Sequence, residues 1–106
     1  MSLGAKLNEL RLKKGESLQQ TADAVGVTKT HVWELEKGKS TNPSAELLRK
    51  LASHFQVTTD FLLNPERDGL TEDDEALVFY RDLKSLNERD QEMVRHMMKV
   101  MKEKKE

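Results

Sequence analysis

The segment 17–37 constrains the fold most strongly, because it combines two short amphipathic helices with a glycine turn between them. Ser17 and Gln20 have the spacing of a capping box, in which each side chain satisfies a free backbone donor of the first helical turn. Apolar residues then follow at helical intervals, and Gly26 can take the left-handed conformation that ends a helix. The sequence therefore predicts one helix between Ser17 and Gly26 and a second that begins at Thr28.

The second of these helices has a large polar surface for its length. Only Val32 and Leu35 are spaced to face a core, so the other side chains remain on the opposite side. In helix-turn-helix proteins the second helix enters the major groove of DNA, and side chains near its start meet base edges. The pattern therefore indicates a helix that can be inserted into a DNA groove.

A series of short motifs runs in order through the first 63 residues. They are Leu3-Gly4, Leu7, Leu10-Arg11, Ser17-Leu18, Ala22, Val25-Gly26-Val27-Thr28, Val32, Leu35-Glu36, Gly38-Lys39 and Asn42-Pro43-Ser44. Together they resemble the Cro/cI-type (XRE-like) helix-turn-helix family, which includes the DNA-binding domain of lambdoid phage repressors. The resemblance implies a five-helix, lambda-repressor-like domain over residues 1–63 that binds double-stranded DNA.

The resemblance also implies which side chains meet the DNA. Base contacts fall on Lys29, Thr30 and Glu34, whose groups suit guanine, thymine and cytosine edges respectively, and the alternative is a solvated charged face. His31 and Trp33 border this surface, and the alternative for Trp33 is packing on the following helix. The loop after it offers many donors to phosphates, the alternative there being a plain hydrophilic turn. The expected backbone contacts are Ser17, Gln19, His31, Trp33, Lys37, Lys39, Thr41 and Asn42.

Arg11 and Glu36 resemble a pair that in this family links the first helix to the end of the recognition helix. A guanidinium can pair with a carboxylate through two parallel hydrogen bonds, so we expect this pair to orient that helix. The alternative is two unrelated surface charges. The chain departs from the family pattern at three positions. Leu18 stands where glutamine is frequent, Thr21 replaces a usual core leucine, and Glu16 replaces a commonly apolar residue.

A second unit is predicted after a break in periodicity. Residues 64–70 read as a linker, and residues 71–106 predict a two-helix hairpin. Its first helix, over about residues 72–85, starts in a capping box, and Asn87 caps the last helix. A hairpin of this length cannot bury a sizeable core alone, so its apolar faces need a partner.

Dimerisation is the favoured use of these faces, because flexible methionines suit a self-complementary interface. The alternatives are a return to the first domain or capture of a different protein, and a methionine-rich cofactor site is disfavoured. The residues expected at the dimer interface are Phe79, Tyr80, Leu83, Val94, Met97, Met98 and Met101.

Composition sets further bounds. The chain has no cysteine, no apolar run of the roughly 18 residues that could span a membrane, and no secretory signal, so we expect a cytoplasmic protein with no membrane partner. The net charge of −1 divides unevenly: residues 1–63 hold nine Lys or Arg against seven Asp or Glu, and residues 64–106 hold nine against twelve. The predicted DNA-binding domain is therefore only modestly basic, and its affinity for DNA has to depend on base readout and two-site binding.

The sequence predicts an all-α, sequence-specific transcription regulator that binds DNA. We expect a repressor that acts as a homodimer on a palindromic operator. The alternative is an antitoxin-like module whose C-terminal helices bind a partner protein, with autoregulatory DNA binding. Metal-ligand spacing, a phosphate loop and a nucleophile with a placed base are all lacking, so we expect neither an enzyme nor a cofactor.

Overall fold

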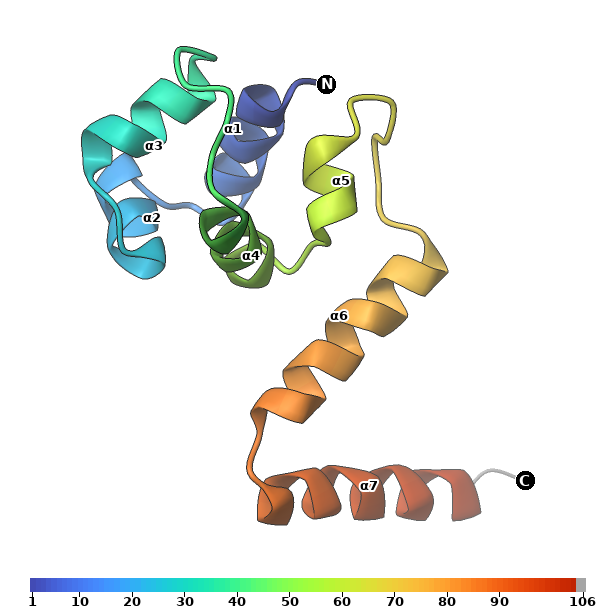
Figure 1. Cartoon of the computed structure of the whole chain (residues 1–106). Coiled ribbons are helices and arrows are strands. Elements are labelled where there is room, and N and C mark those ends of the chain that lie inside the picture. Colours follow the sequence, from blue (N-terminus) through green and yellow to red (C-terminus); the bar gives the residue numbers. More distant parts are fainter. Residues whose placement is uncertain (105–106) are drawn as a thin grey trace.

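The fold places five helices in a bundle from which two further helices extend (Figure 1). The computed structural model describes residues 1–104, and this part of the chain holds helices but no strand, which confirms the all-α prediction. The helices are α1 (Leu3–Lys13), α2 (Leu18–Val25), α3 (Lys29–Glu36), α4 (Ala45–His54), α5 (Thr59–Leu63), α6 (Glu72–Ser85) and α7 (Glu88–Glu103).

Local capping sets the helix starts. The predicted capping boxes at Ser17 and at Thr71 are both present, and Asn87 accepts a hydrogen bond from the backbone of Asp90 as the cap of α7. Gly26 ends α2 with φ of 75°, the left-handed value for which glycine is suited. Side-chain caps of this kind satisfy amides that have no partner inside the helix, which is why the boundaries follow the sequence closely.

The core lies among α1 to α5. Its buried members come from all five helices and the turn before α5: Leu7, Val25, Leu35, Leu47, Leu51, Ala52, Phe55, Val57, Phe61 and Leu62. The backbones of α1 and α3 approach so closely that a Cβ on Gly4 would lie 2.4 Å from the carbonyl oxygen of Leu35. Only glycine fits there, and this contact places the end of α3 against α1.

A buried lysine, which the periodicity does not predict, ties α1 to the end of α5. Lys6 is 1% exposed, and its ammonium donates to the carbonyls of Phe61 and Asn64, with 2.5 Å to the latter. It also lies 4.5 Å from the centre of the Phe61 ring. Burial lowers the pKa of Lys6, and the nearby Asp68 carboxylate acts in the opposite direction.

The predicted linker is held against the bundle. Arg67 pairs with Asp60 at 2.6 Å and with Asp74 at the start of α6. Leu70 packs against the core. Residues 64–70 therefore form an ordered strap that brings α6 back to the domain.

Helix α6 contacts the bundle through a face that the periodicity did not select. Val78 is buried, and the Arg81 guanidinium donates to the carbonyls of Val57 and Ala52 at 3.1 and 3.3 Å. Ala52 lies in the last turn of α4, and Val57 lies in the segment that follows this helix. The return of α6 to the first domain thus leaves Phe79 and Tyr80, on the predicted interface face, exposed.

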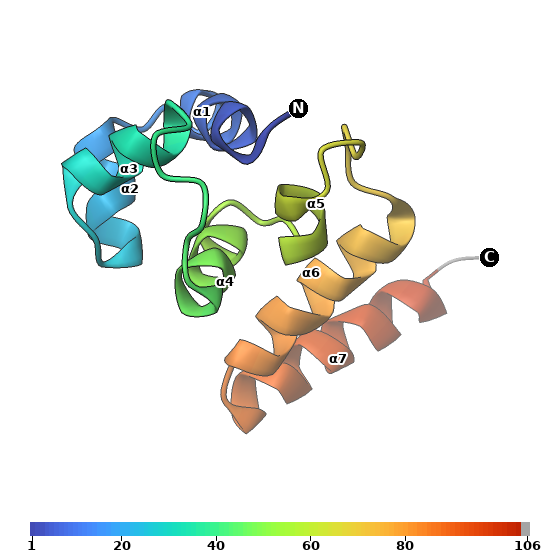
Figure 2. The ribbon, with the colours of Figure 1, turned by 45° about the horizontal axis from the view of Figure 1, so that its top comes forward.

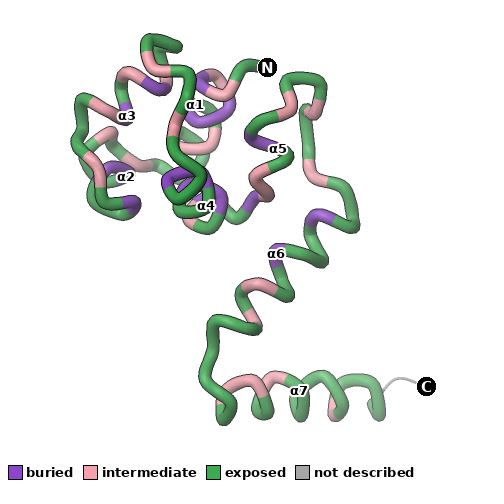
Figure 3. The backbone as a smooth tube through the Cα atoms, in the orientation of Figure 1, coloured by how far each residue is buried: buried purple, intermediate pink, exposed green. Residues whose placement is uncertain are grey.

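Helix α7 has no buried residue (Figure 3). Its methionines are about half exposed or more, from 46% for Met98 to 65% for Met101. Residues 86–87 connect α6 to α7, and Figure 1 shows the two helices meeting there at an angle. An amphipathic helix this open leaves apolar surface in water, which is typical of an interaction site.

Candidate nucleic-acid interface

The helix-turn-helix unit is formed by α2 and α3, at the end of the bundle away from α6 (Figures 1 and 2). The amide of Val27 donates to the Ala22 carbonyl at 3.0 Å and closes the turn. Thr28 then starts α3 by accepting a hydrogen bond from the amide of His31. The turn between the two helices is therefore closed by local hydrogen bonds.

The polar face of α3 points away from the core. Val32 and Leu35 are 2% and 1% exposed, as expected for its inner face. On the other side Lys29 and Thr30 are exposed, and Glu34 is partly covered. The three side chains predicted to meet bases are thus accessible from outside the bundle.

The last turn of α3 is fixed by a largely buried ion pair. Arg11 Nε and Nη2 donate to the two carboxylate oxygens of Glu36 at 2.6 and 3.0 Å, and Asn8 Nδ2 donates to Oε1 at 2.8 Å. The side chains of Arg11 and Glu36 are 12% and 4% exposed. The hydrogen bond with Glu36 raises the pKa of Arg11, against the effect of burial. Asn8 was not predicted as a member of this site, because a neutral polar residue at this spacing gives no distinct signal.

A second polar cluster, partly buried, lies at the turn between α1 and α2. Glu16 Oε1 accepts hydrogen bonds from His54 Nε2 at 2.7 Å and from Thr21 Oγ1 at 2.8 Å. Burial acts to raise the pKa of Glu16, but the hydrogen bonds from His54 and Thr21 outweigh it, so this pKa lies below its usual range. The cluster was not predicted from the sequence, although Glu16 and Thr21 both depart from the family pattern.

The start of α2 presents the first group of predicted backbone contacts. Ser17 Oγ accepts from the Gln20 amide at 3.0 Å, and the Ser17 amide donates to Gln20 Oε1 at 2.8 Å. Gln19 is exposed, and its amide group donates to Asp23 at 2.8 Å. Both residues lie on the surface of the helix-turn-helix unit.

The loop after α3 carries the second group. Gly38 takes φ of 74° and turns the chain, while the amides of Lys39 and Ser40 donate to the carbonyl of Glu34. Trp33 is 39% exposed, and Lys39 Nζ lies 5.6 Å from the centre of its ring. The indole thus borders the exposed surface beside a cation. The other loop residues predicted to meet phosphates are also exposed: Lys37, Thr41 and Asn42.

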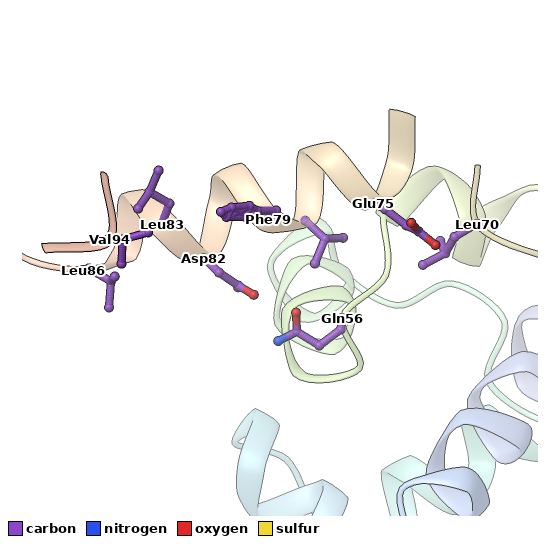
Figure 4. Close-up of a pocket in the computed structure, with 9 residues that line it drawn as sticks. Gln56, Leu70, Glu75, Phe79, Asp82, Leu83, Leu86 and Val94 are labelled. Atoms are coloured by element: carbon purple, nitrogen blue, oxygen red, sulfur yellow. The ribbon is translucent and has the colours of Figure 1, made fainter. Parts of the chain in front are cut away.

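A cavity of about 460 Å³ lies along α6, away from this surface, and is lined mainly by apolar residues that include Leu70, Val78, Phe79 and Leu83 (Figure 4). Within residues 1–104, no group of three or more His, Asp or Glu side chains is arranged to hold a metal ion. No helix in that part of the chain is long and apolar enough to cross a membrane.

The fold and this exposed helix define a helix-turn-helix protein. The helix-turn-helix family matches residues 7–62, more than half of the chain, and the chain belongs to this family. Relatives that share this domain are named as HTH-type transcriptional regulators.

Three relatives illustrate the similarity. The HTH-type transcriptional regulator AnsR of Bacillus subtilis (strain 168) is 44% identical over 66 residues, which cover 62% of this chain and 56% of AnsR. The regulator SinR of Bacillus licheniformis is 35% identical over 66 residues, or 62% of this chain and 59% of SinR. YonR, an uncharacterized SPbeta prophage-derived HTH-type regulator of B. subtilis (strain 168), is 35% identical over 80 residues, covering 71% and 73%. The match to SinR and AnsR thus spans less than two thirds of either relative.

Two solved structures are similar in fold. The N-terminal DNA-binding domain of SinR from B. subtilis has a TM-score of 0.57 at 30% identity, covering 62% of this chain and 96% of that one. A chain of the SinR protein/SinI protein complex has a TM-score of 0.58 at 25% identity, covering 96% and 99%. The second similarity extends through the C-terminal helices.

Proposed function

We propose that this chain is a cytoplasmic, sequence-specific DNA-binding transcriptional regulator that uses α3 as its recognition helix. The observation that carries the proposal is the exposed polar face of α3, whose last turn is held by the buried pair of Arg11 and Glu36. A helix that is polar outside and fixed from behind can enter a major groove without reorganising. The relatives, which are transcriptional regulators, support the same conclusion.

Specificity comes from three side chains of α3. Lys29 donates to guanine, Glu34 accepts from cytosine, and Thr30 contacts a thymine methyl or a base edge. Residues at the start of α2 and in the loop after α3 bind phosphates and fix the register. Since residues 1–63 carry only two more basic than acidic side chains, few phosphates are neutralised and the salt dependence is shallow.

The chain represses as a homodimer on a palindromic operator, by covering a promoter. Support comes from α7, where no residue of the methionine stripe is buried; this stripe consists of Val94, Met97, Met98 and Met101. On a palindromic operator the two copies of α3 have to lie about 34 Å apart, which is the separation of successive major grooves on one side of the duplex.

A second candidate is that the same stripe binds a different protein, as in an antitoxin-like module. The observation that favours it is the similarity, over 96% of this chain, to a chain of a complex between SinR and the protein SinI. In that case the C-terminal helices would control DNA binding by exchanging one partner for another.

The test is selection of bound duplexes from a random pool, using the full chain and two variants. Met97→Glu places a charge within the exposed stripe, and His96→Glu places the same charge on the neighbouring residue outside it. We expect an inverted repeat from the wild type and from His96→Glu, and weak single half-sites from Met97→Glu.

Each other outcome has a definite meaning. No enriched sequence from any of the three would refute a DNA-reading role. An inverted repeat from all three would refute dimerisation through the methionine stripe. Single half-sites from a monomeric wild type would favour the protein partner.

A further inference from the structure

We propose that Glu16 and His54 are positioning residues that hold the start of α2 in the conformation needed for its DNA backbone contacts. The proposal rests on the proposed function and deepens it. Neither residue would touch DNA. They would act through Ser17 and Gln19, which follow Glu16 directly along the chain.

Glu16 is held through one carboxylate oxygen and through both of its backbone polar groups. Its carboxylate accepts a hydrogen bond at 2.7 Å from Nε2 of His54, the last residue of α4, and another at 2.8 Å from Oγ1 of Thr21 in α2. Its amide donates to the Arg11 carbonyl at 3.1 Å, and its carbonyl accepts from Arg11 Nη1 at 2.8 Å. The turn is therefore tied to α1, α2 and α4 at one residue.

The same arginine connects this turn to the recognition helix. Arg11 holds Glu36 through Nε and Nη2 while Nη1 holds the Glu16 carbonyl. The start of α2, where phosphate contacts are proposed, and the last turn of α3, which follows the proposed base contact Glu34, thus share one guanidinium. A shift of Glu16 would displace the proposed phosphate contacts at the start of α2 before it affects α3, because Ser17 is its neighbour in the chain.

Because the Glu16 carboxylate is largely shielded from water, it depends on its hydrogen-bond donors in the protein. The side chains of Glu16 and His54 are 15% and 17% exposed, and Thr21 is 1% exposed. A carboxylate in such a place needs its donors, so removal of His54 leaves it undersatisfied and draws it toward water. That movement displaces the turn. A binding surface that has to be ordered on contact binds more weakly than one already in place.

The test measures duplex affinity for the full chain and for His54→Ala, well below the unfolding midpoint of each. His96→Ala, on the exposed α7, is the matched control. We expect His54→Ala to weaken binding to the selected operator and to random-sequence duplex by the same factor, about 2- to 12-fold, the range of one ordinary hydrogen bond. The salt slope should not change, because the basic contacts remain. His54→Gln, whose side-chain amide can donate in place of the ring Nε2–H, should recover part of the lost affinity.

The decisive comparison uses a background in which Ser17 and Gln19 are both alanine. If His54 acts through these two contacts, His54→Ala has no further effect on affinity there, although it still lowers the unfolding midpoint. Loss by the same factor in both backgrounds, or a lower midpoint with unchanged affinity, would overturn the proposal and show a purely structural pair. If His54→Ala does not fold, Glu16→Gln, which keeps the volume and weakens the pairing, is read in the same way. A wild type that binds no duplex would overturn the proposed function itself, a result distinct from either of these.

Discussion

Replacing Arg11 should be far more damaging than replacing Arg11 together with Glu36. The Glu36 side chain is 4% exposed and accepts three hydrogen bonds, two of them from Arg11. In Arg11→Met only Asn8 remains to hold a buried carboxylate, and a stranded buried charge costs about 3–5 kcal/mol. Against a total stability of about 5–15 kcal/mol, that loss is large.

The double variant Arg11→Met, Glu36→Met removes both charges and keeps most of the side-chain volume. Replacement of a buried ion pair by apolar residues is often neutral for stability, so we expect a cost of about 1–2 kcal/mol, mainly from the carbonyl of Glu16 and the amide of Asn8 that lose a partner. Urea unfolding of the wild type, the two single variants and the double variant gives the coupling free energy. A double variant whose loss equals the sum of the two single losses would refute the reasoning, because two independent surface charges behave in that way.

Three further predictions follow from the interior. Gly4→Ala should lower the free energy of unfolding by about 1–3 kcal/mol in thermal melts, because its Cβ would lie 2.4 Å from the carbonyl oxygen of Leu35; an unchanged midpoint would show that α1 can move away. Lys6→Met should cost about 1–3 kcal/mol and speed hydrogen exchange in the strap at residues 64–70, since it leaves buried carbonyls unpaired; unaltered exchange there would contradict the proposed tie. The hydrogen bonds that lower the pKa of Glu16 contribute stability that is complete above the unfolded glutamate pKa of about 4.3 and is lost as pH falls through the lower folded pKa. The free energy of unfolding of Glu16→Gln should therefore fall less steeply with acid than that of the wild type. Equal pH profiles of the two proteins would exclude this contribution.

The elements of the fold that depend on neighbouring residues could be predicted from the sequence. The capping boxes at Ser17 and Thr71, the left-handed Gly26 and the start of α7 at Asn87 involve groups within four residues of one another. Chemistry at that range is set by residue type and spacing alone. The inner face of α3 followed from periodicity for the same reason.

The parts that depend on distant segments could not be predicted. Lys6 is buried because the carbonyls at the end of α5 meet it, and His54 is paired because the turn before α2 reaches it; nothing in the neighbourhood of either residue indicates this. The docked face of α6 was missed because Arg81 reads as a surface charge until its carbonyl acceptors are known. A long side chain can be amphipathic in this way, with its stem covered and its donors satisfied by backbone.

The DNA contacts themselves stay predictions, since an exposed lysine on a helix serves equally as a base reader or as a solvated charge. The structure supplies the accessible surface and the rigid support behind it. A side chain that contacts base edges is identified by its effect on the discrimination between base pairs.

The most direct test of base reading by α3 is the affinity of the wild type and of Lys29→Ala for the selected operator and for each of its single-base-pair variants. We predict that the wild type loses about 1–3 kcal/mol on substitution of one particular base pair in each half-site, and that Lys29→Ala abolishes the preference at that position alone. Uniform weakening of Lys29→Ala on every duplex, with all preferences retained, would show that Lys29 binds only phosphate and would contradict the assignment of α3 as the helix through which Lys29 reads sequence.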